Sequence, residues 1–221
     1  MQHYYALFSG GLDSTLAILL TLKNPEAVRI TPLFFKYGQR SAEEEEKAVH
    51  ELIPLLRRKV ANPESLVNDL REYDISGLFS WSKSSILQRN LATPPQPDVE
   101  NRNMVLIGCA ASVIMADLID LNTNPLGLIV GFKNEHYDTT RKFARAMDNV
   151  FTAMDKSIHI RTPLLSSKQK EPCAVSRLVK FAYTHDAFDL LQQSWSCYEP
   201  RGHKPCNECL ACGGRSMYVL Q

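Results

Sequence analysis

The chain has 221 residues, of which 44% are apolar and 22% charged, and its formal net charge is +1. These values are typical of a globular protein with a sizeable core, in one domain or one domain with a small appendage. A net charge near zero gives no electrostatic support for binding nucleic acid or an anionic membrane, and the apolar stretches are too short to span a bilayer. We therefore expect no membrane partner. We also expect a cytoplasmic location, because no signal peptide is visible.

The first predicted feature is a strand, a tight loop and a helix. The apolar run Tyr4–Phe8 leads into the loop Ser9-Gly10-Gly11-Leu12-Asp13-Ser14-Thr15, and leucines at helical spacing begin at Leu12. Glycine lets the backbone turn sharply and approach a ligand, and the N–H groups at a helix start attract anions. The loop therefore predicts a phosphate or pyrophosphate site. The alternative is a glycine turn between a core strand and a core helix.

The loop matches neither the Walker P-loop nor the dinucleotide fingerprint G-x-G-x-x-G. Its order, S-G-G-x-D-S-T, resembles the PP-loop of ATP pyrophosphatases, which cut ATP between the α and β phosphates and adenylate a substrate oxygen. The resemblance implies that Asp13 helps to place Mg²⁺ or the phosphates during catalysis. It also implies that ATP and the departing pyrophosphate are bound by Ser9, Gly10, Gly11, Asp13, Ser14 and Thr15.

The next segments predict a second strand and a charged helix. Residues 28–35 are β-branched and aromatic, and Ser41 with Glu44 predicts a capping box at the start of the helix. We interpret Glu43, Glu45 and Glu46 as a solvated acidic run at the positive end of that helix. Residues 61–98 predict a short strand near 65–70 and then a long loop, whose length is typical of a lid or binding segment.

The second half continues the alternation of strands and helices. Asn103 is a predicted N-cap for a buried helix over 104–121, strands are predicted at 126–130 and 158–160, and helices at 142–154, 170–183 and 187–193. The alternation predicts an α/β fold, a parallel sheet with helices on both faces of the PP-loop, Rossmann-like type. Ligands bind such sheets beyond the carboxyl ends of the strands, where Ser9, Tyr37, Gly131 and the exit at Leu164 would meet.

Cysteines gather near the C-terminus with the spacing Cys197-x8-Cys206-x2-Cys209-x2-Cys212. Four thiolates suit a tetrahedral, structural Zn²⁺, and prolines and glycines predict an irregular tail that takes its folding energy from the metal. An iron–sulfur cluster is the competing metal, a redox C-x-x-C pair is a further alternative, and His203 is not expected to be a ligand. We expect residues 1–190 to form the ATP pyrophosphatase domain and residues 191–221 a zinc-binding segment packed on it.

Several further motifs follow the PP-loop in order: Tyr37-Gly38-Gln39-Arg40, Arg102-Asn103, Thr162-Pro163-Leu164 and the cysteine tail. Together they resemble, over most of the chain, the QueC family, the 7-cyano-7-deazaguanine synthases of queuosine biosynthesis. The resemblance implies an ATP-dependent ligase that adenylates the carboxylate of 7-carboxy-7-deazaguanine. With ammonia the enzyme then forms the nitrile through the amide.

The same resemblance implies roles for residues outside the PP-loop. Arg102 and Lys168 are the further expected catalytic residues, and substrate contacts are expected from Tyr37, Gln39, Arg40, Asp138 and Arg141. An ordinary surface or capping role is the alternative for Gln39, Arg40 and Arg102. The expected cofactors and partners are ATP, Mg²⁺, Zn²⁺ and ammonia, in a homodimer.

The chain departs from the family pattern around the substrate. Lys36 replaces the usual acid before Tyr-Gly-Gln, Ser41 replaces a histidine, residues 136–141 differ, and the family lysine could match Lys168 or Lys170. The departures leave an alternative, a QueC-like enzyme that joins the activated carboxylate to an amine of a protein or other partner, as in defence systems. A zinc-ribbon nucleic-acid-binding module is a second alternative, which the near-zero charge disfavours.

Overall fold

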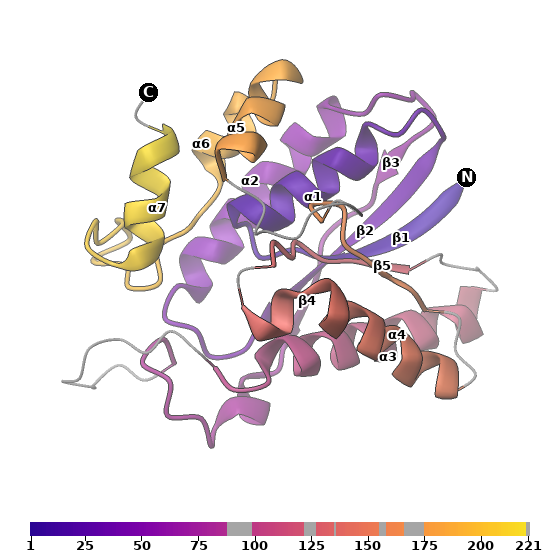
Figure 1. The fold of residues 1–221 in the computed structure, drawn as a ribbon, viewed down its shortest axis with the longest axis horizontal. Helices are drawn as coiled ribbons and strands as arrows, with labels where there is room; N and C mark the ends of the chain where they lie inside the picture. Colours follow the sequence, from indigo (N-terminus) through magenta and orange to yellow (C-terminus); the bar gives the residue numbers. More distant parts are fainter. Residues whose placement is uncertain (88–98, 122–126, 135, 155–157, 166–174, 220–221) are drawn as a thin grey trace.

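In the computed structural model, residues 1–87, 99–121, 127–134, 136–154, 158–165 and 175–219 are described. A single sheet of parallel strands has the order β3-β2-β1-β5-β6, and β4 also pairs with β2 (Figure 1). The strands are β1 (Gln2–Leu7), β2 (Val28–Lys36), β3 (Leu66–Val67), β4 (Arg71–Asp74), β5 (Gly127–Ile129) and β6 (Ile160–Arg161).

Helices cover both faces of this sheet, which confirms the predicted fold class (Figure 1). One face carries α1 (Leu12–Leu22), α2 (Ala42–Arg58), α5 (Val175–Thr184) and α6 (Phe188–Gln193). The other carries α3 (Arg102–Leu121) and α4 (Arg141–Ala153). Both faces of the strands are therefore apolar, as expected for a parallel sheet.

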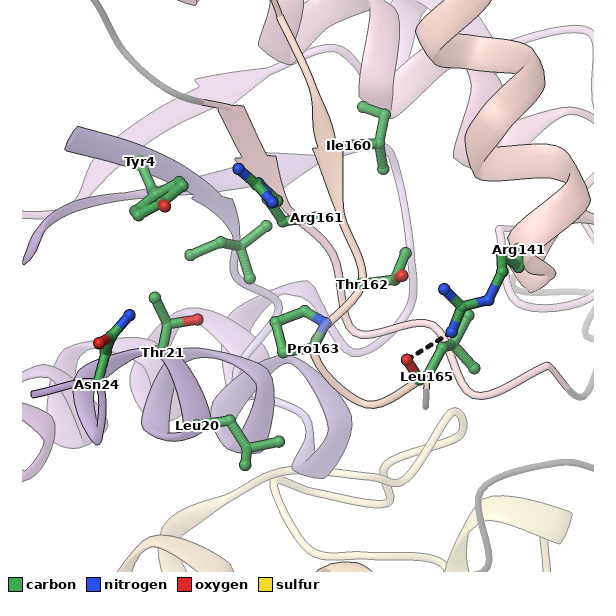
Figure 2. A pocket seen from close by; sticks show the side chains of 11 residues that line it. Tyr4, Leu20, Thr21, Asn24, Arg141, Ile160, Arg161, Thr162, Pro163 and Leu165 are labelled. Carbon is green, nitrogen blue, oxygen red and sulfur yellow. Dashed lines mark hydrogen bonds between the residues drawn. The ribbon is translucent and has the colours of Figure 1, made fainter. Parts of the chain in front are cut away.

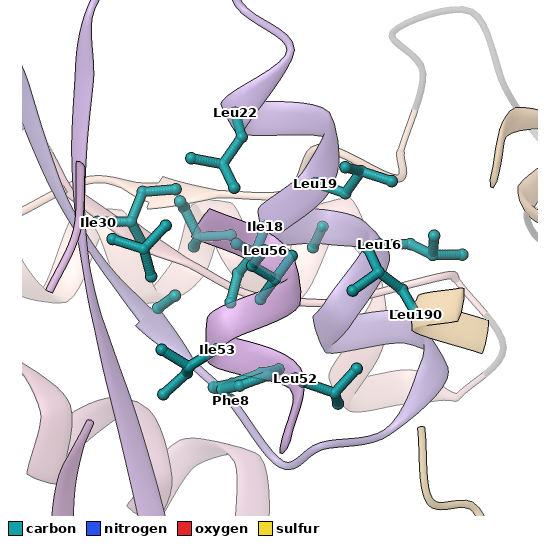
Figure 3. Packing of buried hydrophobic residues seen from close by; sticks show 14 of the residues in the cluster. Phe8, Leu16, Ile18, Leu19, Leu22, Ile30, Leu52, Ile53, Leu56 and Leu190 are labelled. Atoms are coloured by element: carbon teal, nitrogen blue, oxygen red, sulfur yellow. The ribbon is translucent and has the colours of Figure 1, made fainter. Parts of the chain in front are cut away.

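The larger core fixes α1 against the sheet. Leu16, Ile18 and Leu19 of α1 are fully buried, and they pack with Phe8 and Leu52 and with the other apolar residues of Figure 3. Burial of each such side chain contributes about 1.5–3 kcal/mol. The helix α1, which follows the glycine loop, is therefore fixed by the larger of the apolar clusters among the described residues.

The parallel arrangement places several loops at one edge of the sheet. Because β1, β2 and β5 run in the same direction, residues 8–11, 37–41 and 130–133 leave the sheet at its carboxyl edge. Phe8 extends the pairing by one residue, since its N–H donates to the Leu33 carbonyl oxygen at 2.9 Å. The predicted meeting place of these loops is therefore formed.

Residues 61–87 hold more regular structure than the sequence predicts. The short strand predicted near 65–70 is present as β3, but β4 and the 3₁₀ turn η1 (Ser76–Phe79) follow it where a loop was expected. The strand β4, sequence REYD, is polar because both its sides are partly or fully solvent-exposed, so it lacks the apolar signal of a core strand. The remainder of the predicted loop, residues 88–98, lies outside the described residues.

Of two predicted helix caps, Asn103 is wrong, and Ser41 is confirmed in its position but not in its capping hydrogen bond. The helix α3 begins at Arg102, so Asn103 lies inside its first turn, where its side-chain amide donates to Asp138 Oδ2 at 2.9 Å. Ser41 occupies the N-cap of α2 but makes no capping hydrogen bond, because its hydroxyl donates to Glu45 Oε1 at 2.6 Å instead. Both side chains are engaged in these other hydrogen bonds, so neither acts as a cap.

The tail is predicted to be irregular, and part of it is instead helical. The helix α7 (Leu210–Val219) runs through Gly213-Gly214 and begins immediately after Cys209, whose carbonyl oxygen accepts the Gly213 N–H at 3.0 Å. The predicted positions Lys168 and Lys170 lie outside the described residues. Among the described helices, none is long and apolar enough to cross a membrane.

Candidate active site

The glycine loop closes on itself through its hydroxyl groups. The Gly11 carbonyl oxygen accepts hydrogen bonds from Ser14 Oγ at 3.1 Å and from Thr15 Oγ1 at 2.7 Å, and Ser9 Oγ lies 3.2 Å from Ser14 Oγ. Gly11 is the N-cap of α1 and has no side chain to occupy the N–H groups of the first turn. The loop therefore presents the backbone N–H groups of a helix start, the arrangement that binds phosphate, and its hydroxyls hold the loop in shape.

Two glycines make this loop possible. Gly10 has φ +71°, and a Cβ there would lie 3.0 Å from Ala48 Cβ and 3.1 Å from the Glu45 carbonyl oxygen. A Cβ at Gly131 would lie 2.8 Å from the backbone of Asp13 and Ser14. The loop is therefore held between the start of α2 and the exit of β5, with no room for a side chain at either contact.

A lysine that the sequence analysis did not predict contacts the loop. Lys133 Nζ lies 3.2 Å from Asp13 Oδ2, and the lysine side chain is only 14% exposed. A lone lysine in a polar loop carries no motif signal, and only the return of β5 beside β1 brings it to Asp13. Together the two side chains can hold a polyphosphate, since the lysine offers positive charge and the carboxylate is a ligand that Mg²⁺ favours.

Tyr37 and Arg102 form the part of the site beyond β2. Arg102 Nη1 lies 3.4 Å from the Tyr37 hydroxyl, and its guanidinium carbon lies 5.7 Å from the centre of the tyrosine ring. Burial raises the pKa of Tyr37 to about 12, although the nearby Arg102 charge opposes the shift. The pKa of Arg102 is raised, chiefly by Tyr37, with Tyr198 and Asp138 contributing. The pair therefore offers a fixed positive charge, suited to a carboxylate or phosphate.

Gln39 lies beside Tyr37, but its side chain is buried. It is 4% exposed, its amide nitrogen donates to Glu45 Oε2 at 2.9 Å, and its amide oxygen accepts the Tyr37 N–H at 2.8 Å. The interpretation of Glu45 as a solvated residue is wrong, because its carboxylate turns inward to Gln39 and Ser41. Burial raises the pKa of Glu45, against the opposing hydrogen bonds from Ser41 and Gln39 and the Arg102 charge.

The tail contributes directly to the site. The Trp195 N–H donates to the Gly10 carbonyl oxygen at 2.8 Å, and its indole N–H donates to the Cys197 carbonyl oxygen at 2.8 Å. Burial raises the pKa of Tyr198, and the charges of Arg102, Asp13, Glu45 and Lys133 also affect this pKa. Arg40 Nη1 lies 3.9 Å from Glu199 Oε1. The segment that holds the first cysteine is therefore attached to the PP-loop.

The cysteine side chains converge as their spacing predicts. The sulfur atoms of Cys197, Cys206, Cys209 and Cys212 all lie within 4.8 Å of one another, with Cys206 Sγ at 3.5 Å from Cys197 Sγ and 3.8 Å from Cys212 Sγ. A tetrahedral Zn–S distance of about 2.3 Å places the sulfurs about 3.8 Å apart, so the cluster could bind zinc. His203 instead lies 3.0 Å from Glu44 Oε1.

The remaining predicted contacts occupy two places. Asp138 accepts a hydrogen bond from the Asn103 amide, and its charge helps to raise the pKa of Arg102. It therefore belongs to the part of the site that Tyr37 and Arg102 form. Arg141 Nη2 donates to the Leu165 carbonyl oxygen at 2.6 Å and lines a separate cavity of about 410 Å³ beside Thr162 and Pro163 (Figure 2). Lys168 lies outside the described residues.

A glycine loop of this sequence, at the carboxyl edge of a parallel sheet, defines a PP-loop protein. The fold is similar to a crystal structure of a 4-thiouridine synthetase–RNA complex with bound ATP, with a TM-score of 0.52 and 16% identity. The similarity covers 99% of this chain and 50% of that one.

The sequence comparisons narrow this class to one family. The family model described as Queuosine biosynthesis protein QueC matches residues 4–219. A 7-cyano-7-deazaguanine synthase of Campylobacter jejuni is 28% identical over 93% of this chain and 88% of that protein. A 7-cyano-7-deazaguanine synthase of Pyrococcus horikoshii is 28% identical over 100% of this chain and 94% of that protein. The chain belongs to the QueC family.

Proposed function

We propose that this protein is an ATP-dependent C–N ligase that adenylates the carboxylate of 7-carboxy-7-deazaguanine and converts it with ammonia to 7-cyano-7-deazaguanine. The observation that carries the proposal is the placement of Arg102 and Lys133. Arg102 lies 3.4 Å from the Tyr37 hydroxyl and Lys133 lies 3.2 Å from Asp13 of the PP-loop, and the charges of both lower the pKa of Tyr198. A carboxylate at Arg102 and the phosphates at Lys133 would therefore occupy one continuous site.

The chemistry proceeds by two activations. A carboxylate oxygen attacks the α-phosphorus of ATP, and pyrophosphate departs with the electrons of the broken P–O bond. Ammonia then attacks the acyl carbon, AMP leaves, and the amide forms. In the second round the amide oxygen takes the adenylyl group and departs with AMP, while the nitrogen loses two protons and becomes the nitrile.

The proposed roles follow the contacts. Residues 9–15 bind the departing pyrophosphate, Asp13 holds Mg²⁺, Lys133 neutralises phosphate charge, and Arg102 binds the substrate carboxylate. Gln39 acts by positioning Tyr37, while Arg40, Asp138 and Arg141 stay proposals for substrate binding. Zn²⁺ at the cysteines would stiffen the segment that contacts Gly10, which supports residues 191–221 as a structural unit on residues 1–190. A homodimer is the proposed assembly.

One incubation tests the function. Purified protein with ATP, Mg²⁺, ammonium and 7-carboxy-7-deazaguanine is expected to release AMP and pyrophosphate, and mass spectrometry should detect the amide and then the nitrile. Release of ADP and phosphate, or no turnover, would contradict the proposal. AMP release that requires a protein amine and yields a deazaguanine-sized protein adduct would favour the alternative acceptor.

A further inference from the structure

The acidic residues at the start of α2 are not equivalent. Lys36 Nζ lies 2.6 Å from Glu46 Oε1, and His203 Nδ1 lies 3.0 Å from Glu44 Oε1. Glu45 differs, because no cationic nitrogen in the described part of the chain lies within 4.0 Å of its carboxylate. Its two recorded partners are the neutral donors Ser41 and Gln39. A carboxylate turned into the protein without a cation is costly unless a charged ligand completes it.

The Glu45 carboxylate has acceptor capacity left. Ser41 donates to one oxygen and Gln39 to the other, whereas a carboxylate offers about four lone-pair positions. The two donors are 2% and 4% exposed, so they fix the carboxylate from the protein side. Glu45 as a residue is partly exposed, and a small cation would complete the unused acceptor positions of its carboxylate.

Glu45 also lies beside the proposed reacting groups. Its backbone oxygen would be 3.1 Å from a Cβ on Gly10, so its turn of helix packs on the PP-loop. The charges of Arg102 and Glu44 shift the pKa of the Glu45 carboxyl. The Glu45 charge in turn raises the pKa values of Tyr37 and Tyr198. The charges of Asp13 and Lys133 also affect the pKa of the Tyr198 hydroxyl. Gln39 links the Glu45 carboxylate to Tyr37, whose hydroxyl lies 3.4 Å from Arg102, so an amine held at Glu45 would lie on the Arg102 side of the site.

We propose that Glu45 is the binding site and proton acceptor for the protonated amine that attacks the acyl adenylate. This inference rests on the proposed function. Ammonium transfers one proton to the carboxylate, and the neutral nitrogen forms the C–N bond as the C–O bond to AMP breaks. AMP leaves with that electron pair, and the second proton from the nitrogen goes to water. Glu45 then returns its proton to water, so the protein is unchanged.

The raised pKa of Glu45 supports this role, since a weakly acidic carboxyl is a better proton acceptor at neutral pH. Amide formation then needs the ionised carboxylate and is lost as pH falls through the pKa. Ser41 lowers that pKa by donating to the carboxylate. Removing the hydroxyl should therefore move the acid limb of amide formation to higher pH.

The test separates activation from amine capture. For E45Q we expect ATP–pyrophosphate exchange with 7-carboxy-7-deazaguanine within about twofold of wild type. The KM for ammonium should rise about tenfold or more, which corresponds to loss of one charge-assisted contact. In the pH profile of amide formation, the acid limb should disappear in E45Q and move to higher pH in S41A. Glu43→Gln, whose side chain is 76% exposed in the same helical turn, is the matched control and should behave as wild type.

Each outcome is decisive. Wild-type ammonium KM and an unchanged acid limb in E45Q would overturn the amine site while leaving the ligase intact. Parallel loss of pyrophosphate exchange and amide formation in both E45Q and S41A would assign Glu45 a structural role and also overturn it. Absence of pyrophosphate exchange in the wild type would remove the ligase function and the amine site together.

Discussion

The candidate site has two walls, and they differ in the chemical groups that form them. The phosphate wall consists of backbone groups and hydroxyls from seven consecutive residues, 9–15. The opposite wall consists of charged and aromatic side chains from α2, α3 and the tail, among them Glu45, Arg102 and Tyr198. The phosphate wall should therefore be sensitive to added volume. The opposite wall should be sensitive to changes of charge, because the Arg102 charge lowers the pKa of both Glu45 and Tyr198.

The largest expected effect concerns the lysine where the two walls meet. Lys133→Gln should lower the rate of AMP formation about 100-fold or more, the usual effect of removing a group that stabilises developing charge. Chromatographic assay of AMP measures this change. Lys47→Gln is the control, since Lys47 is a 76% exposed lysine on α2. A loss of less than threefold would show that Lys133 only pairs with Asp13.

A single added methyl group tests the volume sensitivity of the phosphate wall. In Gly131→Ala the Cβ would lie 2.8 Å from the backbone of Asp13 and Ser14, so the start of α1 must shift. We expect ATP affinity to fall about tenfold and the free energy of unfolding to fall by about 1–3 kcal/mol. Calorimetric ATP titration and denaturant unfolding measure these values. Gly77→Ala, with no atom within 4 Å of the new Cβ, should leave both unchanged.

Removal of a metal ion bound by the four cysteines would test whether the tail belongs to the site. A chelator should release the segment that contains Trp195, whose N–H holds the Gly10 carbonyl, and should weaken ATP binding about fivefold, or about 1 kcal/mol. Trp195 fluorescence in a Trp81→Phe background should report the release directly. Cys109→Ser should retain the metal, because Cys109 lies on α3 and outside the cluster. Unchanged ATP affinity after complete metal loss would make the tail an independent appendage.

The same comparison explains which features could be predicted from sequence. The strand–loop–helix unit, the cysteine cluster and the alternation of strands and helices carry local signals, namely glycine spacing, C-x-x-C spacing and apolar periodicity. Lys133 and the inward turn of Glu45 carry none, because each depends on a contact between distant segments. The acidic run 43–46 has one composition but two environments, and only the fold of residues 37–41 against α2 separates them.

The smallest expected effect on ATP binding comes from a buried polar network far from both walls. Asp117 accepts hydrogen bonds from the Tyr5 hydroxyl and Arg71 and is 8% exposed. It lies fifteen residues after Arg102 on α3, about 22 Å along the helix. Asp117→Asn removes the charge that both donors contact, which should destabilise the fold by about 2–4 kcal/mol.

Thermal unfolding and ATP titration together measure the Asp117→Asn effect. Its melting temperature should fall by about 5–12 °C while the ATP dissociation constant stays within about twofold of wild type. Asp69→Asn, a 96% exposed partner of Arg57, should change neither quantity. A large loss of ATP affinity in Asp117→Asn at a temperature where the variant is folded would mean that α3 transmits this network to Arg102. The opposite wall would then depend on the whole length of the helix rather than on its first turn.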